Sequence, residues 1–111
     1  MRTEDYDWRS DYNWVEAFHY ADFGMDEVDY LIARDDGEND FEPWIMVGRL
    51  RDKNWFFLTA CCDYTGWDCQ ASGQCYLESN LEKLIQWSLG DSDRRRLKLK
   101  VNVNYSDKYE T

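Results

Sequence analysis

The spacing of apolar residues changes along the chain, and each change predicts a different element. From Tyr12 the large apolar residues recur every three or four positions, which is the spacing of one face of a helix. Gly24 ends this run, and the apolar positions from Val28 to Ile32 predict a second, shorter helix. Residues 1–10 lack such spacing, and we expect them to form a flexible acidic arm.

Alternation with a period of two begins after Pro43 and predicts a sheet. Residues 44–50 are predicted to form one strand, and residues 55–62, which are apolar on both faces, are predicted to form a central strand. The pairs Thr65-Gly66 and Ser72-Gly73 are turn signals, so two more strands are predicted near 67–71 and 74–78. The face expected to form the core carries Phe56, Leu58, Ala60, Cys62, Cys69, Ala71 and Tyr76.

The remainder of the chain predicts one more helix and one more strand. Ser79-Asn80-Leu81-Glu82 has the form of a capping box, which predicts a helix start, and Gly90 is its expected end. Residues 97–105 alternate strictly between apolar and polar side chains, which predicts an edge strand through which two copies of the chain could associate. The chain is therefore predicted to be a single α+β domain over residues 1–111, with an antiparallel sheet of about four strands and helices packed on one face.

Composition narrows the class of protein. Nineteen of the 111 residues are aromatic, which favours a folded core. The chain has no apolar run long enough to cross a membrane, and its start lacks the apolar stretch of a signal peptide. We therefore expect a cytoplasmic protein without a membrane partner.

The net charge of −10 is concentrated in the first part of the chain. Residues 1–42 contain 14 acidic and three basic residues, whereas residues 43–111 contain nine acidic and ten basic residues. An acidic surface repels nucleic acid and attracts basic proteins, although acidity can also serve solubility alone. The residues predicted to contact a basic partner are Asp35, Asp36, Glu38, Asp40 and Glu42. The basic run Arg94-Arg95-Arg96-Leu97-Lys98-Leu99-Lys100 is expected to neutralise acids within the fold.

Most of the candidate chemistry falls in residues 61–70, which read C-C-D-Y-T-G-W-D-C-Q. The C-D-Y-T-G-W-D-C-Q portion resembles the core of small uncharacterised bacterial and phage proteins, and the resemblance extends loosely from Trp44 to Leu97. That group has no known activity. The resemblance therefore implies a phage or mobile-element source and assigns no functional residue.

If Thr65 and Gly66 form a two-residue turn, Asp63 lies directly opposite Asp68. Facing carboxylates repel one another unless something compensates, so Asp63 and Asp68 are the candidate site for a divalent cation such as Mg²⁺ or Ca²⁺. The same register places Cys61 and Cys75 on one face and Cys62 and Cys69 on the other. That arrangement argues against one zinc ion held by all four thiols and favours reduced, structural cysteines.

No catalytic motif is present in the sequence, and the function predicted from it is binding. The leading hypothesis is an acidic module that binds a basic protein, in its narrower form an inhibitor whose surface mimics nucleic acid. One alternative is a small metal-dependent or thiol enzyme centred on Asp63 and Asp68. A second alternative is a structural, self-assembling protein.

Overall fold

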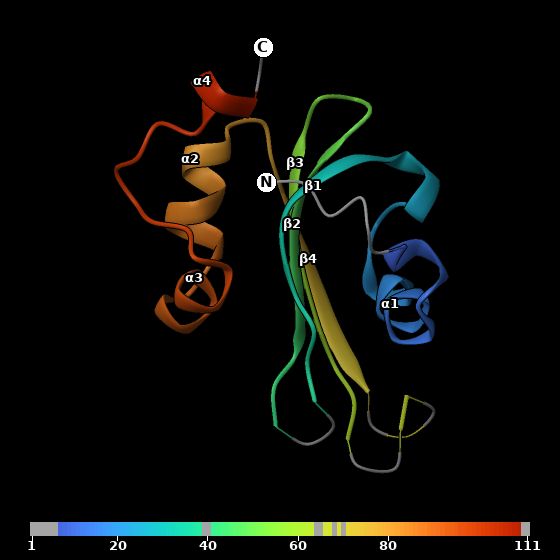
Figure 1. The fold of residues 1–111 in the computed structure, drawn as a ribbon. Helices are drawn as coiled ribbons and strands as arrows, with labels where there is room; N and C mark the ends of the chain where they lie inside the picture. Colours follow the sequence, from blue (N-terminus) through green and yellow to red (C-terminus); the bar gives the residue numbers. More distant parts are fainter. Residues whose placement is uncertain (1–6, 39–40, 64–65, 68, 70, 110–111) are drawn as a thin grey trace.

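The structure is a computed structural model that describes residues 7–38, 41–63, 66, 67, 69 and 71–109. Its centre is a four-stranded antiparallel sheet in which the strands lie side by side in chain order (Figure 1). The strands are β1 (Val28–Asp35), β2 (Trp44–Leu50), β3 (Trp55–Cys61) and β4 (Ser72–Glu78). The predicted α+β class and the antiparallel sheet of four strands are confirmed.

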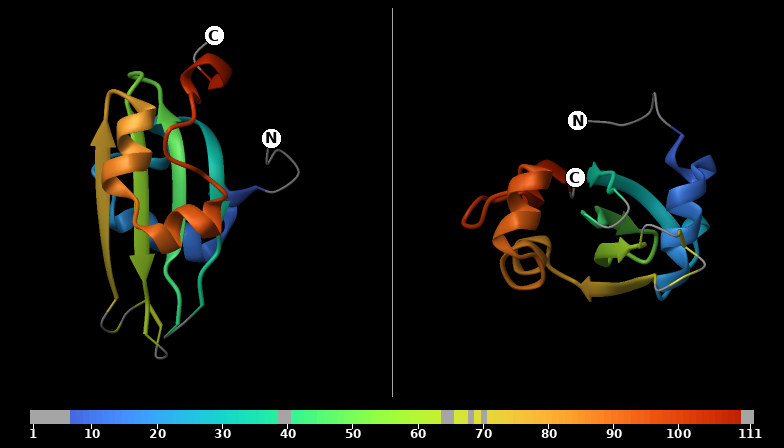
Figure 2. Two further views of the ribbon diagram at one scale, coloured as in Figure 1. Left: turned by 90° about the vertical axis from the view of Figure 1, so that its left-hand side faces the viewer. Right: turned by 90° about the horizontal axis from the view of Figure 1, so that it is seen from below.

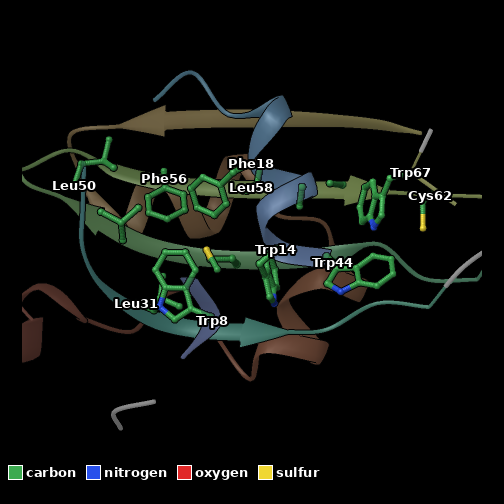
Figure 3. Packing of buried hydrophobic residues seen from close by; sticks show 14 residues of the cluster. Trp8, Trp14, Phe18, Leu31, Trp44, Leu50, Phe56, Leu58, Cys62 and Trp67 are labelled. Atoms are coloured by element: carbon green, nitrogen blue, oxygen red, sulfur yellow. The ribbon is translucent and has the colours of Figure 1, made fainter. Parts of the chain in front are cut away.

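The segment before the sheet covers one face of it and is called the N-terminal layer here (residues 7–27). It contains η1 (Trp8–Ser10), α1 (Tyr12–Ala17), η2 (Phe18–Tyr20) and η3 (Met25–Glu27). Asp11 begins α1 by accepting hydrogen bonds from the backbone N–H groups of Asn13 and Trp14. Trp8, in the stretch expected to be a free arm, is buried against Phe18 with ring centroids 5.5 Å apart. Figure 3 shows Trp14 between Trp8 and Trp44 in the core that this layer forms with the sheet.

The segment after the sheet covers the opposite face and is called the C-terminal layer (residues 81–109), as Figures 1 and 2 show. It contains α2 (Leu81–Lys83), which continues as the π-helical turn η4 (Leu84–Ser88), then α3 (Asp91–Leu97) and α4 (Ser106–Tyr109). The helix start predicted at the capping box is confirmed, with Asn80 accepting the N–H of Lys83 at 2.9 Å. Its buried leucines form a second core with the other sides of β2 and β3.

The prediction that helices cover only one face is therefore wrong. Every residue of β2 except Arg49 is buried, and so are the first four residues of β3. A strand with apolar side chains on both faces needs a cover on each face, because either face left open would expose that apolar surface to water. The N- and C-terminal layers provide these two covers.

The helix predicted from Val28 to Ile32 is in fact strand β1. Its register against β2 shifts between Val28 and Tyr30 and again between Leu31 and Ala33. Each shift changes which face the following side chains occupy, so that Val28 and Leu31, three positions apart, both join the core under the N-terminal layer. Two bulges thus give this strand apolar spacings that are typical of a helix.

The strand predicted for residues 97–105 does not form either. Helix α3 runs to Leu97, and Lys98 then adopts a left-handed conformation with φ of 61°. The N–H of Leu99 closes the helix end by donating to the Arg94 carbonyl at 3.0 Å. The single left-handed residue lets Leu97 and Leu99 both bury in the second core, which explains the alternation without a strand. The expected edge for self-association is therefore not at this position.

Candidate functional site

Two of the connections between strands lie at the same end of the sheet, because alternate turns of an antiparallel meander lie at the same end. The connection from β1 to β2 spans residues 36–43, and the connection from β3 to β4 spans residues 62–71. Figure 1 shows both at the lower end, opposite the short turn that joins β2 to β3. The predicted acidic residues and the cysteine-rich segment therefore lie at the same end of the molecule.

The base of the β1–β2 hairpin is held from the side of the N-terminal layer. Trp14 of α1 is fully buried, and its indole Nε1–H donates to the Asp36 carboxylate at 2.9 Å. The guanidinium of Arg34 donates to the same Asp36 oxygen. An indole N–H inside a core needs an acceptor, and Asp36 supplies it. Asp36 is therefore an anchor between the hairpin and α1.

The C-terminal layer holds the same hairpin from the other side through Arg96 of α3. Its Nε–H donates to the Asp35 carboxylate at 2.8 Å, and its Nη2 donates to the Asp36 carbonyl at 3.3 Å. A Glu42 oxygen lies 4.0 Å from the same Nε. The Arg96 side chain is 12% exposed and that of Asp35 is 44% exposed, so the pair is only partly screened by water. We call this set of contacts the Arg96 clamp.

The described part of the hairpin between Asp36 and Pro43 is called the tip, meaning residues 37, 38, 41 and 42. The backbones of Glu38 and Glu42 pair, with N···O distances of 2.9 and 3.2 Å. Gly37 makes this closure possible, since a Cβ there would lie 2.3 Å from the Glu42 carbonyl oxygen. The side chain of Phe41 is 82% exposed, and both glutamates are exposed beside it. The tip therefore presents an aromatic ring among carboxylates.

The five residues predicted to bind a partner fall into three groups. Asp35 and Asp36 form ion pairs and hydrogen bonds within the fold, Glu38 is exposed at the tip, and Glu42 is exposed at the tip while one of its carboxylate oxygens lies 4.0 Å from the Arg96 Nε. Asp40 lies outside the described residues. The expectation that the basic run from Arg94 to Lys100 neutralises acids of the fold is confirmed for Arg96, which pairs with Asp35, and for Arg94, which pairs with Asp91.

Sequence reasoning passed over Phe41. It lies in a loop outside any apolar periodicity, with acidic residues on both sides. A large apolar residue that no periodic face accounts for is a signal that could have singled it out.

The β3–β4 connection differs from its predicted form. Asp63 pairs with Gly66, whose N–H donates to the Asp63 carbonyl at 2.9 Å, whereas the predicted two-residue turn placed Thr65 and Gly66 between Asp63 and Asp68. Asp68 itself lies outside the described residues. Strand β3 pairs directly with β4, with Cys61 opposite Ser72, and Ser72-Gly73 belongs to a strand instead of a turn. A cation bound by Asp63 and Asp68 therefore stays a prediction from the sequence.

The loop between these strands is tied to the N-terminal layer by Trp67. Its ring lies 5.1 Å from that of Trp44, and its Nε1–H donates to the Asn13 side chain at 2.9 Å. Asn13 and Trp14, which are neighbours in α1, therefore anchor one connection each. Helix α1 fixes the base of both loops at this end of the sheet.

All four cysteines are free thiols. Cys75 lies opposite Leu58 and packs against the first core, whereas the sequence had placed it on the face of Cys61. Tyr76, predicted for the first core, packs in the second, and Cys69 is exposed. Burial raises the pKa of the Cys75 thiol; a hydrogen bond with the Asp22 backbone opposes the rise and the Asp22 charge adds to it.

Within the part of the chain that the structure describes, no three His, Cys, Asp or Glu side chains come together as a metal-binding group. No described helix is long and apolar enough to cross a membrane. Comparisons of the chain with protein-family models, with curated proteins and with solved structures find no match. The hairpin tip and the contacts that hold it are therefore the candidate functional site.

Proposed function

We propose that this protein is an acidic protein-binding module that presents the tip of its β1–β2 hairpin to a basic protein surface. The observation that carries the proposal is Phe41, whose ring is 82% exposed on a hairpin anchored from both layers of the fold. An aromatic ring held in water contributes little to stability. In an interface, the same ring is a typical anchor residue.

The carboxylates around Phe41 suggest the chemistry of the partner. Glu38 and Glu42 are exposed, and the whole chain carries a net charge of −10. Acidic groups around an apolar anchor favour a partner with an apolar pocket bordered by Lys or Arg, and they accelerate association at low salt. The Trp14 and Arg96 contacts support the proposal further, because a preorganised loop loses less conformational entropy on binding.

Charge is also distributed unevenly between the two faces. The N-terminal layer contains six Asp or Glu residues and one Arg, whereas the C-terminal layer contains four acidic and seven basic residues. A basic partner seated on the tip is therefore attracted towards the side of the N-terminal layer. Four free thiols fit a reducing, cytoplasmic setting, which forms part of the same proposal.

The proposal is tested with an Arg- and Lys-rich peptide added to isotope-labelled protein and followed by NMR. The amide signals of Glu38, Phe41 and Glu42 are expected to shift, with smaller changes in the C-terminal layer. Phe41→Ser should weaken binding roughly 30-fold, the effect of losing about 2 kcal/mol at an anchor. The matched control is Trp87→Ser, which removes a 72% exposed aromatic from η4 and should leave affinity unchanged. Equal losses in both variants, or shifts confined to the C-terminal layer, would contradict the proposal.

The narrower hypothesis, that the acidic surface mimics nucleic acid, needs a separate measurement. A partner captured at low salt is released by competing duplex DNA only if the tip and the DNA occupy the same basic surface. Retention of the partner in the presence of excess DNA would limit the proposal to ordinary protein binding.

A further inference from the structure

The two edges of the sheet differ in how well they are protected against pairing with another strand. Strand β1 forms one edge, and it has two register shifts and several charged residues. Arg9 also donates to its Val28 carbonyl at 2.9 Å. Bulges, charges and covering side chains are the usual protections of an edge strand. Strand β1 is therefore poorly suited to pair with another chain.

Strand β4 forms the other edge and lacks the register shifts and the several charges of β1. Its register against β3 is continuous from Glu78 to Ser72, and Glu78 is the only charged residue among its seven. Within the described residues, no backbone hydrogen bond to β4 comes from any segment other than β3. Figure 2 shows β4 at one side of the sheet with no described segment beyond it. A regular, nearly uncharged edge of this length is a template for strand addition.

We infer that the outer edge of β4 pairs antiparallel with β4 of a second copy of this chain, continuing the sheet across a two-fold axis. The register that pairs all seven residues places Cys75 opposite Cys75. Gln74 then faces Tyr76, Gly73 faces Leu77, and Ser72 faces Glu78. Each of these three pairs occurs twice and the Cys75 pair lies on the axis, as a symmetric dimer requires.

The side chains suit this self-pairing. Leu77 is 44% exposed in the single chain and would lie opposite Gly73, where the Tyr20 side chain takes the place that a Cβ would fill. Tyr76 already donates to Gln74 within one strand, and in the dimer the same two groups also meet across the strands. The serine hydroxyl can donate to the glutamate carboxylate that it faces. No pair places like charges opposite one another.

Repulsion between the two negatively charged chains is the main force against this dimer. Where the acidic residues lie in the dimer decides how strong that repulsion is. In the full register the two Glu78 carboxylates lie at opposite ends of the ladder, about 20 Å apart, well beyond the screening length of about 8 Å. The two N-terminal layers, in contrast, would lie on the same side of the joined sheet, so their acids repel. Salt should therefore strengthen the dimer, whereas it weakens binding of a basic partner at the tip.

Analytical ultracentrifugation of the whole chain with a reducing agent tests this inference at low and high salt. The expected result is a mass that doubles from 13.4 kDa as concentration rises through the micromolar range, at lower concentration in high salt. Leu77→Lys and, separately, Gln74→Lys place a charge on each face of β4 and should keep the chain monomeric. Val15→Lys, at a 37% exposed site on α1, is the matched control and should dimerise like the native chain.

Hydrogen exchange locates the contact independently of the substitutions. Alternate amides of β4 should gain protection at high protein concentration and lose it on dilution, while those of β1 should not change. A chain that stays monomeric at every concentration and salt, or a dimer that persists in both lysine variants, would overturn the inference. Phe41→Ser should leave the dimer intact, so failure at the tip and failure at β4 are separate results.

Discussion

Replacing Asp35 with asparagine removes the carboxylate that accepts the Arg96 Nε–H at 2.8 Å and so tests whether the Arg96 clamp is structural. A hydrogen bond to a charged group contributes about 1.5–3 kcal/mol, and a fully exposed ion pair contributes about 0.2–1 kcal/mol. Arg96 is mostly buried and Asp35 is 44% exposed, so we expect a value between these limits. Asp35→Asn should lower the free energy of unfolding by about 1 kcal/mol.

Arg96→Gln should cost more, about 2 kcal/mol, because it also removes the bond to the Asp36 carbonyl and the charge near Glu42. The assay is urea unfolding of the two single variants and the double variant, from which a double-mutant cycle gives the coupling energy between Asp35 and Arg96. We expect a coupling of about 1 kcal/mol, reduced by added salt. Arg95→Gln, at an exposed position of the same helix, is the matched control and should change stability by less than about 0.5 kcal/mol.

The same variants separate the structural acids from those of the tip. At a temperature where all variants are folded, Asp35→Asn should bind the basic peptide almost as tightly as the native chain. Glu38→Gln with Glu42→Gln should slow association and flatten its salt dependence. A coupling energy indistinguishable from zero would refute the clamp. A loss of binding in Asp35→Asn as large as that in the tip variant would refute the division of roles.

The remaining predictions concern the C-terminal layer and the buried thiol. Ending the chain at Arg96 removes the buried Leu97 and Leu99, so the free energy of unfolding in urea should fall by roughly 3–6 kcal/mol. The double substitution Val101→Ser with Val103→Ser, at two exposed sites, should change it by less than about 1 kcal/mol. If the truncation and the double substitution lowered the free energy of unfolding equally, residues 97–105 would be better described as a strand. Because burial raises the pKa of Cys75, its alkylation at neutral pH, followed by mass spectrometry, should be slower than that of the exposed Cys61 and Cys69. Labelling of Cys75 as fast as Cys69 would contradict this burial.

Local sequence signals determined those elements whose pattern comes from residues close together in the chain. The strand over 44–50, the central strand from Trp55 and the helix that begins after Asn80 all form where their apolar spacing and capping residues predict. In each of these segments the period of the apolar residues matches the geometry of the element, so the pattern and the fold agree.

Tertiary structure decided the elements in which a local irregularity changes the period. Two bulges shift the faces of β1 and make a strand look helical, and one left-handed residue at Lys98 lets a helix end look like a strand. Neither irregularity can be recognised from residue type, because each is stabilised by packing against segments far away in the chain.

The candidate site depended most on tertiary structure. The sequence showed where the acids are concentrated, yet it could not show that Arg96, 61 residues beyond Asp35, would pair with it. Nor could it show that a carboxylate next to Asp35 would accept the indole N–H of Trp14. Whether an acidic side chain supports the fold or faces a partner depends on which distant donors the two layers bring to it, and only folding places those donors.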